Sequence, residues 1–158
     1  MKYRSLFFVA YLMVVGPSCA SDGGSSSVQS AVSDARRFIT ERNAAGLLTL
    51  ISRDGVLCGD DVISRARVNS DLRRPITPLY KRVFGDSSRA ASELSLRGWF
   101  VGHPTATPRI DFIQVDGKVR DDWACVRFRD ENSTSPFELC FFRKQRRWTL
   151  TNSLYDCE

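Results

Sequence analysis

Two β-rich segments near the C-terminus, 123–129 and 137–143, each carry one cysteine and are joined by a polar turn segment, 130–136. When Cys125 is placed opposite Cys140 in an antiparallel hairpin, one register aligns both segments, and a shift by one residue moves apolar side chains to the wrong face. That register gives an apolar ladder on one face, and an opposite-charge pair and an aromatic pair on the other: Val126–Leu139, Phe128–Phe137 and Ala124–Phe141, then Arg127–Glu138 and Trp123–Phe142. Because such cross-strand pairs stabilise antiparallel sheets, the sequence predicts this hairpin in this register.

The N-terminus has the composition of a secretory signal peptide. Lys2 and Arg4 precede an unbroken apolar run, 6–15, and small residues follow at 18–20. The run is too short to span ~30 Å of hydrocarbon as a helix, so we expect a signal peptide over 1–20 and no permanent transmembrane anchor. The mature protein is therefore expected to be periplasmic or secreted, in a compartment where disulfides persist.

Two interpretations of the cleavage site stay open. Cleavage after Ala20 places Ser18 and Ala20 at the two small positions that a signal peptidase requires, and it releases the protein. Alternatively, Cys19 becomes the lipidated first residue of a membrane-anchored lipoprotein, and the Ser/Gly-rich segment 21–27 serves as its flexible tether. Gly16 occupies the position where a lipoprotein signal has a branched aliphatic residue, which favours release.

Both interpretations leave four cysteines for pairing, an even number that indicates disulfides in an exported chain. Opposed residues at a non-hydrogen-bonded position of an antiparallel pair lie about 4.5 Å apart at Cα, a distance that a disulfide spans. We therefore predict Cys125–Cys140, which leaves Cys58–Cys157 to close a loop of about 100 residues. A reactive Cys58 thiol is the alternative, but the adjacent acidic loop residues would raise its pKa.

The remaining pattern predicts one α+β domain over 28–158, with N-terminal helices packed on a C-terminal antiparallel β-meander and two disulfides. Val28, Val32, Ala35 and Ile39 recur at helical spacing and form the apolar face of the first helix. Shorter helices are expected at 43–54, 64–72, 78–84 and 92–100. Strands are expected at 56–58, from 110 up to a turn at 116–117, and in the two segments of the cysteine hairpin. A last strand, 148–155, is expected after a charged turn, 143–147.

An opening helix pair and a sheet that ends in an Arg-Trp-hydrophobic strand occupy segments 38–56 and 137–154, with the motifs Phe141-Phe142-Arg143 and Arg147-Trp148-Thr149-Leu150. This order resembles the NTF2-like (cystatin-like cone) superfamily. The resemblance implies a cone-shaped fold around a pocket that some members use for catalysis and others for binding or dimerisation. Catalytic members often carry an Asp–His or Tyr–Asp pair in the pocket. No such pair is placed in this sequence, so no catalytic residue is carried over.

Charge and motif content argue against several functions. Removal of Lys2 and Arg4 lowers the net charge from +5 to +3, which is too small to indicate a nucleic-acid partner. With a single histidine, His103, and the cysteines paired, the chain lacks a convergent set of metal ligands. Phosphate-binding and nucleophile-elbow motifs are also absent from the sequence. We therefore predict no catalytic site, no metal and no cofactor.

Two features could contact a partner. The basic turn formed by Arg143, Lys144, Arg146 and Arg147 would suit an acidic partner or lipid headgroups, although its simplest role is to keep one end of the sheet soluble. Trp99 would be an anchor for a partner protein, provided that it is exposed.

Two hypotheses on function follow. The first is an exported, non-catalytic envelope protein of inhibitor or immunity type that binds a protein partner, such as a toxin or a wall-acting enzyme. The alternative is an NTF2-like pocket protein that binds a small ligand or acts as an enzyme. A cavity lined by two or more buried polar groups would favour the alternative, and a filled core would exclude it. The sequence does not predict the oligomeric state.

Overall fold

The computed structural model describes residues 27–58, 60–86, 95–131, 133–151 and 154–155, so the signal segment 1–20, Cys19 and nearly all of the tether lie outside the described residues. The described helices are α1 (Val28–Thr40), α2 (Ala44–Thr49), α3 (Arg65–Arg73), α4 (Pro78–Phe84) and α6 (Leu96–Gly102). The described strands are β1 (Val56–Cys58), β2 (Asp61–Ile63), β3 (Thr107–Val115), β4 (Lys118–Asp130), β5 (Ser133–Thr134), β6 (Leu139–Lys144) and β7 (Arg147–Leu150). This is the predicted α+β class.

Every described helix begins at a residue whose side chain caps it. The capping side chains each accept a hydrogen bond from the backbone N–H three residues further on, and they are Ser27, Asn43, Ser64, Thr77 and Ser95. A cap of this kind contributes about 1 kcal/mol of helix stability. Local sequence therefore sets where these helices start, as predicted for the cap at Asn43 and for the helix that begins at Pro78. None of the described helices has the length and apolar character needed to cross a membrane.

The main sheet is antiparallel in the order β3-β4-β6-β7, and β5 pairs with the end of β4. β4 and β6 adopt the predicted register from Trp123 to Val126, with Trp123 opposite Phe142 and Cys125 opposite Cys140. The predicted Phe128–Phe137 pair is wrong, because the Phe128 backbone bonds to Ser135 instead. The predicted turn at 116–117 joins β3 to β4, and both of its residues have the positive φ that a two-residue type I′ hairpin requires. A separate two-stranded ribbon pairs β1 with β2.

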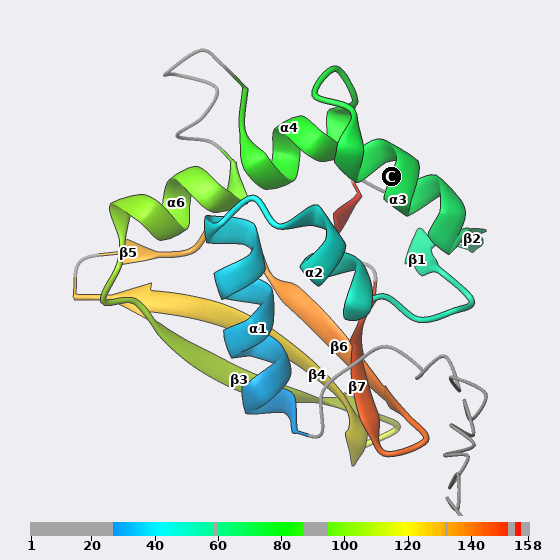
Figure 1. The fold of residues 1–158 in the computed structure, drawn as a ribbon. Coiled ribbons are helices and arrows are strands. Elements are labelled where there is room, and N and C mark those ends of the chain that lie inside the picture. Colours follow the sequence, from blue (N-terminus) through cyan, green and yellow to red (C-terminus); the bar gives the residue numbers. More distant parts are fainter. Residues whose placement is uncertain (1–26, 59, 87–94, 132, 152–153, 156–158) are drawn as a thin grey trace, which may run out of the picture.

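Helix α1 lies across one face of the main sheet (Figure 1). The contact is filled by side chains with no exposed surface, including Ala35 and Ile39 from α1 and Leu139 and Phe141 from β6. Because side chains alternate along a strand, Phe142 and its cross-strand neighbour Trp123 lie on the opposite face. The helix-covered face of the sheet is therefore a packed core, and the pocket that the NTF2-like resemblance implies is not formed between α1 and β6.

Trp99 is a core residue, which corrects its prediction as a partner contact. It lies on α6 with 8% of its surface exposed, and its ring centroid lies 5.5 Å from that of Phe137 and 6.3 Å from that of Phe128. His103 stacks on Trp99 at 4.4 Å, and its Nδ1 lies 2.9 Å from the Trp99 carbonyl oxygen. The condition of exposure fails because this aromatic cluster covers the indole.

Three further details differ from the prediction. The charged turn consists of two residues, Gln145 and Arg146, because Lys144 and Arg147 pair with each other as strand residues. The strand β7 ends at Leu150 and does not continue to residue 155. The sequence did not predict β2, because the segment that forms it follows a polar loop and has only three residues.

Candidate functional site

A cleft of about 440 Å³ opens where the face of the sheet turned away from α1 meets the β1–β2 ribbon. Its volume lies within the range of ligand-binding pockets in proteins. We call it the apolar cleft, and its lining residues come from the α2–β1 loop, the ribbon and the strands β4, β6 and β7: Ser52, Asp54, Gly55, Val56, Leu57, Val62, Trp123, Phe142, Lys144, Thr149, Leu150 and Thr151.

Gly55 shapes the loop that forms one wall of the apolar cleft. Its φ is +106°, and a Cβ at this position would lie 2.0 Å from the backbone carbonyl oxygen of Ile63. The Gly55 N–H donates to the Ser52 carbonyl oxygen at 3.1 Å, and the Ser52 hydroxyl accepts from the Asp54 N–H at 3.3 Å. Only glycine has both the backbone freedom and the small size to bring the chain this close to β2.

Two contacts hold this loop against the edge of the main sheet. The Leu150 N–H donates to the Leu50 carbonyl oxygen at 2.8 Å, which ties the end of α2 to β7. The Lys144 ammonium lies 2.7 Å from a carboxylate oxygen of Asp54. The hydrogen bond and the charge of Lys144 both lower the pKa of Asp54. Asp54 is therefore an ionised acceptor at neutral pH and a poor proton donor.

The inner surface of the apolar cleft is aromatic and its rim is aliphatic. The rings of Trp123 and Phe142 meet edge to face, with centroids 5.9 Å apart. Leu57 and Val62 stand beside them with 41% and 57% of their surfaces exposed. Exposed aliphatic side chains next to half-buried aromatic rings form an apolar surface. Covering this surface with a partner removes it from water, which is energetically favourable.

Two buried threonines supply polar groups in the apolar cleft. Thr149 and Thr151 are each 7% exposed. The Thr149 hydroxyl donates to the Phe142 carbonyl oxygen at 3.1 Å, so its oxygen keeps its acceptor capacity. The lining therefore combines large apolar area with a few fixed polar groups, the composition typical of binding pockets.

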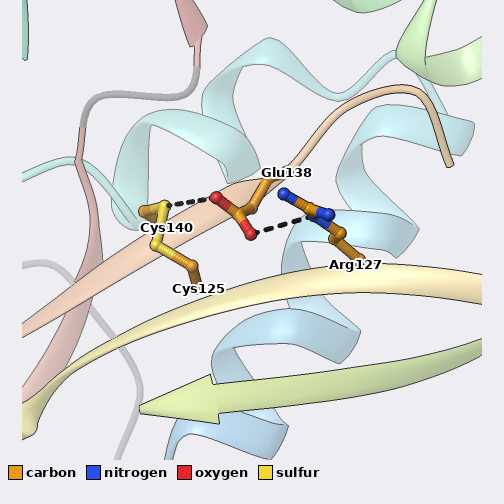
Figure 2. Close-up of a disulfide and its surroundings, with 4 residues drawn as sticks. All are labelled: Cys125, Arg127, Glu138 and Cys140. Carbon is orange, nitrogen blue, oxygen red and sulfur yellow. Dashed lines mark hydrogen bonds and ion pairs between the residues drawn. A yellow bond between two sulfur atoms is a disulfide. The ribbon is translucent and has the colours of Figure 1, made fainter. Parts of the chain in front are cut away.

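The predicted disulfide Cys125–Cys140 is confirmed, with the two Cα atoms 4.0 Å apart. Figure 2 shows it beside the predicted ion pair, in which Arg127 Nε lies 3.2 Å from Glu138 Oε1. The other Glu138 oxygen lies 3.7 Å from Cys140 Sγ. Cys125 and Cys140 each lie two residues from an aromatic residue of the apolar cleft, so the disulfide covalently fixes the two strands that carry Trp123 and Phe142.

Cys125, Cys140 and Glu138 also form a group of three potential metal ligands within the described part of the chain. The two sulfur atoms are bonded to each other, so neither offers the thiolate that a metal would bind. Cys58 is disulfide-bonded as well. Its predicted partner, Cys157, lies outside the described residues, so the Cys58–Cys157 pairing stays a prediction.

The basic turn contributes one residue to the apolar cleft. Lys144 lines it, whereas the Arg143 guanidinium lies over the Trp148 ring and 2.7 Å from an Asp121 carboxylate oxygen. Arg146 and Arg147 are exposed. Figure 1 shows that the β6–β7 turn and α6, which carries Trp99, lie at opposite ends of the sheet. The predicted contact residues therefore do not form one surface.

No protein-family model, curated protein or solved structure matches this chain. The resemblance to the NTF2-like superfamily accordingly stays a hypothesis, and the residues themselves carry the functional argument.

Sequence reasoning missed most of the apolar cleft. One signal was available, because the predicted register places the large aromatic side chains of Trp123 and Phe142 on the face away from the core. A second signal was the apolar pair Leu57 and Val62, which flanks a polar turn. The bond between Leu50 and Leu150, which brings these segments together, has no local sequence signature.

Proposed function

We propose that this chain is an exported, non-catalytic binding protein of the cell envelope, of inhibitor or immunity type, and that the apolar cleft receives apolar side chains of its protein partner. One observation carries the proposal: exposed Leu57 and Val62 frame the half-buried rings of Trp123 and Phe142 in a preformed hollow. In protein interfaces, a few anchor side chains in well-packed, desolvated pockets carry most of the binding free energy, and tryptophan is enriched among them.

The rigidity of the cleft supports tight recognition. The Cys125–Cys140 disulfide, the Lys144–Asp54 ion pair and the Leu150–Leu50 hydrogen bond hold its walls before any partner arrives. A preformed site loses less conformational entropy on binding than a flexible one. The ionised Asp54–Lys144 pair at the rim would orient polar groups that surround the inserted side chain.

The test compares capture of a partner from periplasmic extract by three forms of the mature protein. Val62→Lys places a charge in the apolar cleft, and Ile76→Lys makes the same change at an apolar residue that is 76% exposed and does not line the cleft. We expect the wild type and Ile76→Lys to retain the same partner and Val62→Lys to lose it. Equal retention by all three forms would contradict the proposal.

A small apolar ligand is the second candidate, bound in the apolar cleft and not in the cone pocket that the NTF2-like resemblance implies, because α1 and β6 form a packed core there. The volume of about 440 Å³ lies in the range of small-molecule pockets, and two buried polar residues, Thr149 and Thr151, line it. Protein purified without denaturation would then carry a small molecule detectable by native mass spectrometry. That molecule would be lost from Val62→Lys and kept by Ile76→Lys.

We also propose the second bridge, Cys58–Cys157, and export with either release after Ala20 or lipidation of Cys19. Peptide mapping of the unreduced mature protein should join the Cys58 peptide to the Cys157 peptide. Recovery of a Cys58–Cys125 peptide would overturn the pairing. The mass of the N-terminal peptide distinguishes a free Ser21 from a lipid-modified Cys19.

A further inference from the structure

Strand β3 forms an edge of the main sheet, and β4 is its one neighbour among the described residues. The hydrogen bonds of β4 show which β3 residues direct their backbone N–H and C=O groups toward the open edge. Phe128 donates its N–H to the Ser135 hydroxyl at 3.0 Å and accepts at its carbonyl oxygen from the Ser135 N–H at 2.8 Å. Both groups of Phe128 therefore point away from β3, so its partner Pro108 makes no backbone hydrogen bond to it.

Because backbone groups alternate in direction along a strand, Pro108, Ile110 and Phe112 all direct their backbone groups to the open edge. Pro108 lacks an N–H and therefore leaves a gap in that edge. A register shift between Phe112 and Gln114 interrupts the β3–β4 ladder, which continues at Gln114 and Val115 in a different register. The part of the edge able to accept another strand is thus 108–112.

We propose that this edge pairs with β3 of a second copy of the chain, antiparallel and centred on Ile110. In that register Ile110 faces Ile110 of the second copy, and each Phe112 N–H donates to the Pro108 carbonyl oxygen across the interface. The three hydrogen-bonded pairs of this register would form six hydrogen bonds if every residue had an N–H. Pro108 lacks one and lies at each end of the ladder, so two of the six bonds are missing.

Charge complementarity selects the register. Arg109 and Asp111 lie on the same face of β3, with Arg109 Nε 3.2 Å from Asp111 Oδ1, and both side chains are more than half exposed. Pairing centred on Ile110 places each Arg109 opposite an Asp111 of the second copy, which gives two ion pairs at close, non-hydrogen-bonded positions. Centring on Arg109 or on Asp111 would instead place like charges opposite each other.

The other face of the strand is apolar and fits the same register. Pro108, Ile110 and Phe112 share this face, and Phe112 is 43% exposed. Centred on Ile110, each Phe112 ring meets Pro108 of the second copy. Proline, charges and a bulge on an edge strand discourage pairing with other chains. Here they leave one register that satisfies both faces, and β3 is separated from the apolar cleft by the width of β4, so the cleft stays accessible.

The test is sedimentation equilibrium of the mature, disulfide-bonded protein at low ionic strength. Arg109→Asp and Asp111→Arg each place like charges opposite each other twice, and the double variant Arg109→Asp/Asp111→Arg restores both ion pairs. We expect a concentration-dependent dimer whose Kd rises about tenfold in each single variant. The double variant should return to within about threefold of the wild type.

Circular dichroism of each variant checks that the exposed substitutions leave the fold unchanged. A wild type that stays monomeric at every soluble concentration overturns the proposal. So does a dimer that neither single substitution weakens, or a double variant that dimerises no better than the single variants. If Val62→Lys dimerises with the same Kd as the wild type, the dimer interface does not involve the apolar cleft.

Discussion

Removal of the Cys125–Cys140 disulfide should destabilise the protein by about 3 kcal/mol, because the bond closes a loop of 15 residues in the unfolded chain. The suitable variant is Cys125→Ala/Cys140→Ala, since both positions are less than 10% exposed and a serine hydroxyl would be buried there without a designed partner. With a urea m-value of about 2 kcal/mol/M, the unfolding midpoint falls by about 1.5 M. The m-value itself should rise, because the unfolded chain without the cross-link exposes more surface.

The control is Arg127→Ala, which removes the ion pair next to the disulfide and leaves the cross-link intact. Arg127 is 59% exposed in this pair, so its loss should cost less than about 1 kcal/mol. Equilibrium urea unfolding followed by far-ultraviolet circular dichroism measures both variants. A loss below about 1 kcal/mol for the double alanine variant, with an unchanged m-value, would refute the reasoning, because it would show that the unfolded chain already holds this hairpin closed.

Three further predictions concern individual backbone and titratable positions. Gly117→Ala should lower the free energy of unfolding by about 1 kcal/mol, because φ is +73° but no atom lies within 4 Å of the new Cβ. Gly55→Ala should lower it by at least about 2 kcal/mol more, because the new Cβ clashes with the Ile63 carbonyl oxygen. Urea unfolding of both variants compares the two losses. Arg146→Gly should raise the free energy of unfolding by about 0.5–1 kcal/mol, because Arg146 has φ 67° in a two-residue turn and glycine adopts positive φ without strain. A lower free energy of unfolding would contradict this. Burial first, and then Asp71, raises the pKa of Tyr155 above its ordinary value of 10.0, so the folded state keeps a proton that the unfolded state loses. The contribution of Tyr155 to the free energy of unfolding should therefore be complete below pH 10 and decline above it. Urea unfolding midpoints measured across this pH range should show that decline in the wild type, and Tyr155→Phe should flatten it.

The sequence predicts the β4–β6 hairpin because several independent cross-strand pairs agree on one register. Cys125 with Cys140 and Trp123 with Phe142 lie opposite each other as expected. The start of α2 was predictable as well, since Asn43 caps it by accepting a hydrogen bond from the Gly46 N–H three residues further on. Where local chemistry determines an element, one sequence suffices to locate it.

Features that depend on tertiary contacts were not predictable. The burial of Trp99 results from packing against Phe128 and Phe137, which lie far along the chain. The apolar cleft depends on a hydrogen bond between Leu150 and Leu50 and on an ion pair between Lys144 and Asp54. No spacing rule links these positions, so the cleft emerges only when the sheet edge and the α2–β1 loop are placed together.

Hydrogen–deuterium exchange of the mature protein, alone and saturated with the partner captured from extract, tests the role of the apolar cleft most directly. The account predicts slower exchange in the α2–β1 loop, in the β1–β2 ribbon and in β7, with unchanged exchange in α6. Protection confined to α3, α4 or α6, with the ribbon and β7 unaffected, would contradict it.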